Sequence, residues 1–378
     1  MIIKNASVYT EDERFLSKDI WIEKDHFVDC EEKVSDKTVI DGTGCYAIPG
    51  LTDIHFHGCV GHDFCDGTEE AIDAMAAYEA SVGVTNIVPA TMTLGEDTLL
   101  EICKTAKAYR EAGLKEKRAR LCGINMEGPF VAASKKGAQN GAYIRTPDLD
   151  MFDKLNEASG FMVKLIAIAP EVEGAMEFIE RRHDEVVISL AHTATDFDTA
   201  VLAFEKGANH VTHLYNAMNP YTHRAPGLVG AAVDTQKVEV ELICDGVHIH
   251  PAAVRTTFKM FGDDRIILIS DSMMATGLED GDYSLGGQAV KVVGNLATLQ
   301  DGTIAGSATN LMDCLRTAVL KMGIPLESAV KCAAVNPAKS VGIYDRYGSI
   351  APQKKANVVL LKKEDLSLRQ VVLEGQLL

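Results

Sequence analysis

The sequence lacks the features typical of membrane or nucleic-acid-binding proteins. No apolar run approaches membrane-spanning length, and the opening segment MIIKNASVYT has none of the anatomy of a signal peptide. Positive charge is scarce, because 37 Lys and Arg face 54 Asp and Glu and leave a net charge of -17. Nucleic-acid binders are normally basic, at least locally. We therefore expect a soluble cytoplasmic protein whose partners include neither a membrane nor a nucleic acid.

Two further signatures are missing. The nine cysteines form no CxxC pair, so reduced cytosolic thiols are expected. Cys59 and Cys65 could add metal ligands, but buried small hydrophobic residues are the preferred interpretation. A doubly wound open sheet would favour a glycine-rich phosphate loop after its first strand, and the sequence has none.

What is present is an alternation of strand-like and helix-like patterns. Eight apolar runs read as strands: LTDIHFH, VTNIVPATMT, ARLCGINME, FMVKLIAIAPE, EVVISLAH, NHVTHLYN, VEVELICDGVH and RIILISD. Most are separated by helical patterns such as TEEAIDAMAAYEASVG and DFDTAVLAFEKG. This alternation predicts an α/β fold, a (β/α)8 TIM-like barrel.

Both ends of the chain carry β-rich segments. The few strands at either end would bury too little surface to form a stable sheet alone. We expect residues 1–50 and 347–378 to form one small β-sandwich domain, with residues 51–346 as the barrel. Residues 217–236 connect the sixth and seventh predicted strands. This connection has the weakest helical pattern of those between the strands, so we expect a long functional loop there. A hairpin with Asp301-Gly302 as its turn is expected after the eighth strand, followed by a helix in NLMDCLRTAVLKMG.

Metal-capable side chains stand at the predicted carboxyl ends of these strands, where barrel enzymes carry their active sites. His55 and His57 are two apart in PGLTDIHFHG, so on a strand both imidazoles point to the same side. The later strands end in Glu127, His192, His213, Asp245 with His248, and Asp271. One such histidine is most often structural, but this convergence predicts a metal hydrolase site.

Five other histidines are not predicted to belong to the site, and they serve as a comparison for those that are. We interpret His26, His62, His183, His210 and His250 as structural or surface residues. His210 lies three residues before His213, so on a strand it should face the other way.

These motifs resemble the amidohydrolase superfamily and, within it, the N-acetylglucosamine-6-phosphate deacetylase family. The resemblance rests on PGLTDIHFHG, MEGPF with KKGAQNGAY, AHTATD, THLYNAMNPYTHRAPGLVGA, CDGVHIHP, ISDSMMATG and DGTIAGSATNL, which occur in one order along most of the chain. It implies hydrolysis of the acetamide of N-acetyl-D-glucosamine 6-phosphate to D-glucosamine 6-phosphate and acetate, in amino-sugar catabolism or recycling. It also implies a homodimer whose second subunit contributes to the phosphate site.

The resemblance further implies the roles of individual residues. Glu127, His192 and His213 would hold the main metal, and His55 and His57 a second, with Glu127 and Asp271 shared. Zn2+ is the first choice for one or two ions per subunit, and Fe2+, Mn2+ and Co2+ are alternatives. Metal-bound hydroxide would attack the carbonyl, because a divalent metal lowers the pKa of water to about 7. Asp271 would act as general base and acid, and His248 would polarise the carbonyl or orient the sugar.

An anionic substrate needs local cations or N–H donors in so acidic a chain. Arg224 is the candidate for the phosphate because a guanidinium offers planar bidentate geometry, although without the surrounding motif a solvated loop charge would be favoured. Asn216 and Ala217 would add side-chain and backbone donors. Gln139 stands where many relatives carry histidine, so it must act as a neutral donor to the substrate or leave that role to His248.

Other interpretations remain open. Dihydroorotase-like or hydantoinase-like enzymes bridge two metals with a carboxylated lysine, and Lys164 is the candidate, but it lies early in its strand, away from the predicted site. A deaminase would share the metal residues but gives no use for THRAPGLVG or HLYNAM. A catalytically silent barrel scaffold is the alternative of another class, and such proteins usually lose metal ligands, which this sequence retains.

Overall fold

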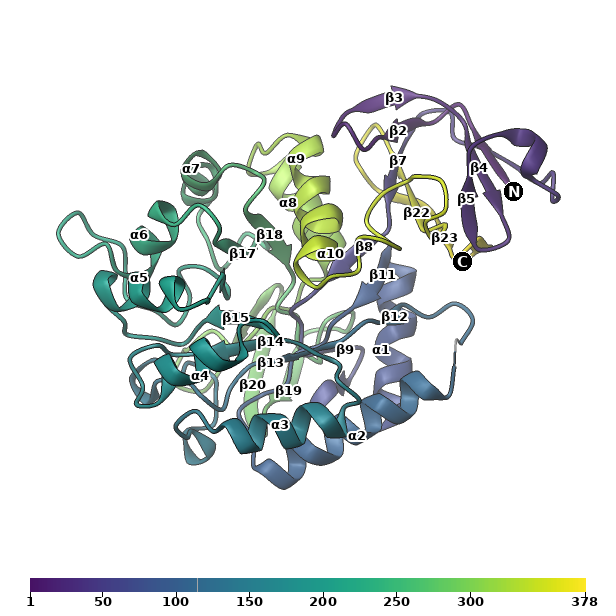
Figure 1. Ribbon diagram of the computed structural model, residues 1–378. Coiled ribbons are helices and arrows are strands. Elements are labelled where there is room, and N and C mark those ends of the chain that lie inside the picture. The colour runs from purple at the N-terminus through teal and green to yellow at the C-terminus, as the bar shows by residue number, and fades with distance from the viewer. Residues whose placement is uncertain (114) are drawn as a thin grey trace.

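The computed structural model describes residues 1–113 and 115–378. An alternation of parallel strands and helices makes up most of the chain, and short strands from both chain ends gather at one side of the molecule (Figure 1). Among the described residues, no helix has the length and apolarity that crossing a bilayer requires. The predicted α/β class is confirmed.

A curled parallel sheet lies at the centre of the fold. One part has three strands, β8 (Leu51–Asp53), β11 (Val84–Ile87) and β12 (Arg120–Leu121). The other part has six strands in sequence order: β13 (Ile124–Met126), β14 (Val163–Ile168), β15 (Val187–Leu190), β16 (His210–Val211), β17 (Glu239–Ile243) and β18 (Ile266–Ile269). Runs such as IILI in β18 are buried throughout, as parallel strands covered on both faces require.

Backbone hydrogen bonds connect the two parts of this sheet. Ala90 forms a parallel bridge with Asn125, between the segment after β11 and strand β13. At the other edge, the N–H of Asp271 donates to the carbonyl of His55 over 2.9 Å. The segments that follow β8 and β18 are therefore direct neighbours.

Helices α1 to α7 lie between the parallel strands along the chain, and α8 to α10 follow β18. They are α1 (Glu69–Ser81), α2 (Glu96–Glu111), α3 (Leu149–Ala158), α4 (Ala175–Arg182), α5 (Phe197–Glu205), α6 (Gly227–Asp234), α7 (Pro251–Phe261), α8 (Leu311–Leu320), α9 (Leu326–Val330) and α10 (Asn336–Ser340), with a π-helix at Lys331–Val335. Thr68, Asp148, Asp196 and Asn310 begin four of them, because each side chain accepts a backbone hydrogen bond that the first turn leaves open.

One expectation about the connections is wrong in part, and another is confirmed with an additional sheet. The predicted loop 217–236 contains helix α6, an eight-residue segment of small apolar residues that shows no polar face in the sequence. The predicted hairpin is present, because Thr298 and Ile304 form an antiparallel bridge across the turn at Asp301-Gly302, where Gly302 N donates to Leu299 O over 3.0 Å. The same segment also forms a three-stranded antiparallel sheet of β19 (Gly281–Leu285), β20 (Gln288–Val293) and β21 (Leu296–Thr298).

Strands from the two ends of the chain pair with each other. One sheet has the order β24-β23-β22-β7-β2-β3 and contains β2 (Ser7–Tyr9), β3 (Phe15–Ser17), β7 (Cys45–Pro49), β22 (Val358–Lys362), β23 (Leu368–Leu373) and β24 (Gln376–Leu377). The other has the order β5-β4-β1-β6 and contains β1 (Ile2–Lys4), β4 (Ile20–Glu23), β5 (His26–Val28) and β6 (Val39–Asp41). Strands β7 and β22 are antiparallel partners over five residue pairs.

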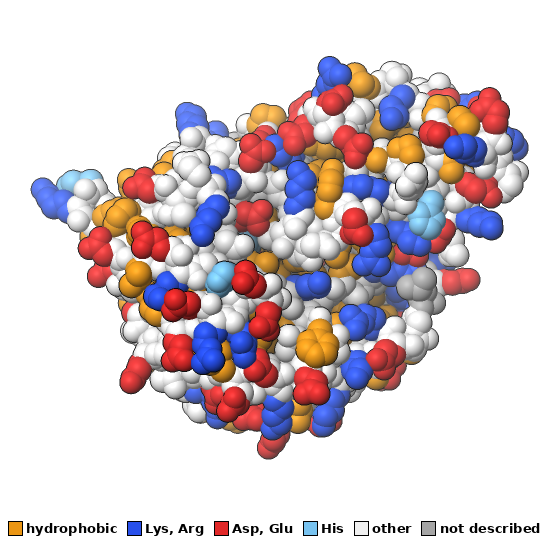
Figure 2. Space-filling view, viewed as in Figure 1, with side chains coloured by type: hydrophobic (Ala, Val, Ile, Leu, Met, Phe, Trp, Pro, Cys, Tyr) orange, Lys and Arg blue, Asp and Glu red, His pale blue; other side chains and the backbone are white. Residues whose placement is uncertain are grey.

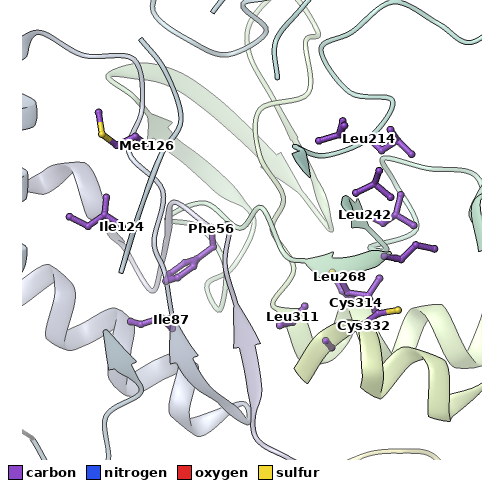
Figure 3. Close-up of a cluster of buried hydrophobic side chains, with 14 of the residues drawn as sticks. Phe56, Ile87, Ile124, Met126, Leu214, Leu242, Leu268, Leu311, Cys314 and Cys332 are labelled. Atoms are coloured by element: carbon purple, nitrogen blue, oxygen red, sulfur yellow. The ribbon is translucent and has the colours of Figure 1, made fainter. Parts of the chain in front are cut away.

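The main hydrophobic core fills the space between the parallel sheet and its helices. Figure 3 shows Leu268 of β18 near Leu311 and Cys314 of α8, whereas Ile87 of β11 and Ile124 of β13 lie on the other side of the same cluster. These side chains have exposed fractions of 0%. A separate core cluster, which includes Val8, Ile22 and Leu360, joins the sheets of the chain ends. The packed core places the carboxyl ends of the parallel strands at one edge, where the polar residues gather.

Candidate metal centre

The site residues follow the parallel strands and do not lie within them. β8 ends at Asp53, so the prediction that His55 and His57 lie on a strand is wrong. Both imidazoles nevertheless meet, with 5.5 Å between ring centroids. Glu127 comes directly after β13, and His213 comes two residues after β16. The strand ends supply position, and the loops after them direct the side chains.

Backbone conformation explains how several of these side chains turn toward one another. His192, His213 and Asp271 have φ values of 44°, 30° and 49°. This left-handed region is uncommon for residues other than glycine, and strained residues of this kind cluster at functional sites. The strand alternation used to orient side chains therefore stops at these residues.

Glu127, His192 and His213 form one metal-capable group. Glu127 Oε1 lies 3.0 Å from Nε2 of His192 and 3.0 Å from Nε2 of His213. His192 Nδ1 lies 2.9 Å from the carbonyl oxygen of Lys135, which can only accept, so Nδ1 carries the proton. The Nε2 lone pair of His192 is thereby directed at the centre of the group.

His55, His57 and Asp271 form a second metal-capable group beside the first. Asp271 Oδ1 lies 3.3 Å from His57 Nε2 and 3.8 Å from His55 Nε2. Glu127 connects the groups, because its Oε2 lies 3.3 Å from His57 Nε2 while its Oε1 belongs to the first group. One carboxylate is thus shared by two sets of ligands, so this arrangement can hold two ions side by side.

The donor set fits divalent metal ions. His55 is completely buried, yet its Nε2 has no hydrogen-bond partner among the described residues, although unpaired buried polar atoms are costly. Imidazole and carboxylate ligands suit Zn2+ and other first-row divalent metals. These residues can therefore hold one ion or two without any change of ligand type.

The electrostatics of the site agree with this assignment. Burial alone would lower the pKa of His57, but Asp271 and Glu127 raise it to about 10. Burial would raise the pKa of Asp271, but His57 and His55 hold it below its ordinary value. Metal binding must displace the proton on His57, because a ligating imidazole is neutral.

A cavity of about 330 Å³ opens over the two groups. Its lining includes His57, Glu127, Gln139, His192, His213, Asn216, Ala217, His248 and Asp271, with Met92, Leu285 and Ile304 as an apolar wall. The predicted metal, catalytic and substrate residues thus meet here, apart from His55, which lies beneath the cavity, and Arg224. Arg224 is exposed in the loop before α6, which projects from the molecule beside α5 (Figure 1). Figure 2 shows basic and histidine side chains on this projection.

Two cavity residues are held by their own partners. Asp245 accepts from His248 Nδ1 over 2.7 Å, so His248 Nε2 remains for the cavity. Burial would lower the pKa of His248, but Asp245 raises it. Gln139 Oε1 accepts from the backbone N–H of Thr93 over 2.7 Å, and its Nε2 donates to Glu127 Oε2 over 2.6 Å. Gln139 therefore contacts a metal-capable carboxylate directly.

Sequence reasoning missed Glu241 and misplaced His210. Glu241 lies in β17 with an exposed fraction of 0% and contacts His55. A charged residue inside the apolar run VEVELIC was the available signal. His210 is also completely buried and does not face away, because its Nε2 lies 3.9 Å from Glu241 Oε1. The alternation argument failed because β16 ends at Val211, before His213.

The other candidates lie outside the centre. Lys164 lines a separate cavity with His183, so it offers no bridging ligand here. Cys59 is buried among apolar residues, and burial raises its pKa well above the ordinary value. Cys65 Sγ accepts from Met92 N over 3.2 Å. His250 accepts a hydrogen bond at the start of α7.

Comparisons with known proteins found a matching family and related proteins. The sequence profile of the Amidohydrolase family matches residues 46–378. The chain is 38% identical to an N-acetylglucosamine-6-phosphate deacetylase of Bacillus subtilis, over 84% of this chain and 81% of that protein. It is 33% identical to an N-acetylgalactosamine-6-phosphate deacetylase of Escherichia coli O157:H7, over 87% and 86%.

A solved structure is similar over the whole chain. It is an N-acetyl-D-glucosamine-6-phosphate deacetylase variant from Mycobacterium smegmatis, in complex with N-acetyl-D-glucosamine-6-phosphate. The TM-score is 0.91 and the identity 31%, covering 100% of this chain and 98% of that one.

Proposed function

Because the chain belongs to the amidohydrolase family, we propose that it hydrolyses the acetamide of N-acetyl-D-glucosamine 6-phosphate. The products are D-glucosamine 6-phosphate and acetate, which places the enzyme in amino-sugar catabolism or recycling. The observation that carries the proposal is the pair of metal-capable groups sharing Glu127 under one cavity. A cytoplasmic location remains part of this proposal.

Glu127, His192 and His213 would hold the first ion, and His55, His57 and Asp271 the second. Zn2+ is the first choice, with Fe2+, Mn2+ and Co2+ as alternatives, at one or two ions per subunit. When bound, such an ion polarises the acetyl carbonyl and makes water more acidic.

Asp271 is the proposed general base and acid. Its carboxylate lines the cavity, and its lowered pKa keeps it ionised at neutral pH, as a base must be. It takes a proton from the attacking water and returns that proton to the sugar nitrogen. Without this second transfer the amine is too poor a leaving group.

His248 is the proposed hydrogen-bond donor to the substrate. Asp245 holds its Nδ1 and raises its pKa, so a proton on Nε2 can face the acetyl carbonyl or the sugar. Gln139 is the alternative donor. Since the hydrogen bond to Glu127 already uses one of its two amide hydrogens, His248 is the better placed of the two.

Asn216, Ala217 and Arg224 are proposed to bind the phosphate. Asn216 and Ala217 line the cavity, whereas Arg224 does not. We therefore propose that Arg224 reaches the phosphate in the cavity of a second copy of the chain, within a homodimer. A guanidinium on an exposed, projecting loop is suited to that role.

The finer architecture is also part of the proposal. We propose that β8 and β18 close the curled sheet into a (β/α)8 barrel, and the hydrogen bond from Asp271 N to His55 O supports this. We propose residues 51–346 as the barrel domain, and residues 1–50 with 347–378 as a small β-sandwich domain. The pairing of β7 with β22 supports that division.

N-acetylgalactosamine 6-phosphate is a second candidate substrate, because one relative of 33% identity is a deacetylase of that sugar phosphate. Acetate release should be measured with both sugar phosphates and with unphosphorylated N-acetylglucosamine, after chelation and again after metal addition. We expect metal-dependent release that is fastest with N-acetylglucosamine 6-phosphate. Preference for the galactose epimer would change the substrate, and no release from any of them despite bound metal would reject the proposed function.

A further inference from the structure

Glu241 has no part in the reaction described above, yet it contacts both metal-capable groups. Its side chain is completely buried in β17. Oε2 accepts a hydrogen bond from His55 Nδ1 over 2.9 Å and another from the backbone N–H of His213 over 3.0 Å. His55 belongs to one group and His213 to the other. A single oxygen atom of Glu241 thus accepts hydrogen bonds from one residue of each metal-capable group.

The contact with His55 determines which nitrogen faces the ions. The carboxylate oxygen accepts, so His55 Nδ1 carries the proton and Nε2 presents its lone pair. That Nε2 lies 3.5 Å from Glu127 Oε1 and 3.8 Å from Asp271 Oδ1, and it has no hydrogen-bond partner among the described residues. Glu241 therefore holds His55 in the tautomer and the orientation that a ligand needs.

The other oxygen of Glu241 shows that the carboxylate is not an ordinary buried ion pair. Oε1 has no hydrogen-bond partner within the described chain and lies 3.9 Å from His210 Nε2. His210 Nδ1 is paired with Ser189 Oγ over 2.9 Å. A buried carboxylate costs stability unless it is fully paired, so a purely structural group would be expected to satisfy both oxygens.

We propose that Glu241 is a positioning residue for the second ion of the two-metal site. It orients His55 Nε2 and supports the backbone at His213, and the ion held by His55, His57 and Asp271 binds tightly only when this acceptor is present. The inference rests on the proposed metal centre but not on the identity of the substrate.

The test uses Co2+ and measures binding, not activity. Chelated full-length protein is titrated with Co2+ and followed by metal analysis and by the visible absorption of the bound ion. Wild type is expected to take up two ions per chain. Glu241→Met removes the acceptor and is expected to weaken the second ion about 100-fold, with a smaller effect on the first. Glu241→Gln keeps an oxygen for both hydrogen bonds but loses the charge, so a loss of about 10-fold is expected.

Glu79→Gln is the matched control, because Glu79 is a completely buried glutamate in α1 that belongs to neither metal-capable group. It should bind both ions as wild type does. Wild-type affinity for the second ion in Glu241→Met would overturn the proposal, as would a wild-type chain that binds one ion at saturation. If Glu241→Met does not fold, unchanged second-ion affinity in Glu241→Gln overturns it. Acetate release is assayed separately, so failure of the proposed function gives a different result.

Discussion

Gln139 donates a hydrogen bond to Glu127, with 2.6 Å between Gln139 Nε2 and Glu127 Oε2. The orientation of the amide is determined by chemistry, because the backbone N–H of Thr93 can only donate and faces Gln139 Oε1 over 2.7 Å. The NH2 group must then face the carboxylate. Gln139 therefore holds the carboxylate that both metal-capable groups share.

Gln139→Ala should weaken metal retention as well as turnover. Groups that hydrogen-bond a metal ligand typically contribute about 10-fold or more to metal affinity. We expect the variant to lose its metal about 10-fold faster in a chelator competition, measured by metal analysis over time. Asn140→Ala is the control, because the side chain of Asn140 accepts from Ala142 N and does not line the cavity. Equal retention in wild type and Gln139→Ala would show that Glu127 needs no such support.

Asp271→Asn should abolish turnover while the first metal site keeps its ion. The amide cannot accept and return the proton, and general acid–base catalysis contributes about 10²–10⁴-fold to the rate. Metal analysis should still find the ion held by Glu127, His192 and His213. Acetate release within a few-fold of wild type would remove Asp271 from the proton transfers.

Arg224→Ala should affect the phosphorylated substrate selectively. A lost charge-assisted hydrogen bond is worth about 2 kcal/mol, which corresponds to about 30-fold in KM. The KM for unphosphorylated N-acetylglucosamine should stay unchanged, and Arg14→Ala, an exposed arginine in the segment before β3, should behave as wild type. Equal effects on both substrates would exclude Arg224 from the phosphate site.

Mixing variants tests whether Arg224 acts across a dimer. A dimer of one Arg224→Ala subunit and one Asp271→Asn subunit has one cavity with Asp271 intact and with Arg224 supplied by the neighbour. Mixed dimers, made by refolding the two chains together, should regain activity that neither parent has at low substrate concentration. The sum of the parental activities and nothing more would mean that Arg224 does not act from a second copy.

Glu79→Gln should make stability less dependent on pH. Burial, with a further contribution from Asp53, raises the pKa of Glu79 well above its ordinary value, and neither oxygen has a hydrogen-bond partner in the described chain. Above the ordinary pKa the unfolded chain releases this proton while the folded chain keeps it. The free energy of unfolding then falls as pH rises, by about 1.4 kcal/mol per pH unit until the raised pKa is reached.

Glu79→Gln has no carboxyl proton at this position. Its free energy of unfolding should therefore rise relative to that of wild type as the pH increases from 5 to 8. Urea unfolding midpoints at several pH values, at one fixed metal concentration, measure the difference. A constant difference across this range would mean that Glu79 ionises normally in the folded protein.

The sequence predicted the residues of this site better than the geometry that joins them. His55, Glu127 and Asp271 could be found because each follows an apolar strand-like run, and strand order brings such ends together. Glu241 and His210 were missed, since their contacts join segments that are distant in sequence, and the charge of Glu241 inside an apolar run was the one signal for either. Alternation along a strand also says nothing about residues with left-handed φ, such as His213.

The exposed position of Arg224 was foreseen only in the alternative of a solvated loop charge. The resemblance implied that a second subunit contributes to the phosphate site, but the motif THRAPG did not identify Arg224 as the residue that reaches across. Helix α6 was missed for a simpler reason, because GLVGAAVD is short and apolar up to its last residue, so periodicity carries little signal there.

The pairing of β7 with β22 has a consequence for how the protein is made. β7 precedes the whole parallel sheet in the chain, whereas β22 follows it, and the two are neighbours in one sheet. During synthesis on the ribosome, this edge of β7 therefore stays open until the whole parallel sheet and then β22 have emerged. Open strand edges attract other chains. A chain that ended before Val358 would lack β22 and would leave that edge of β7 unpaired.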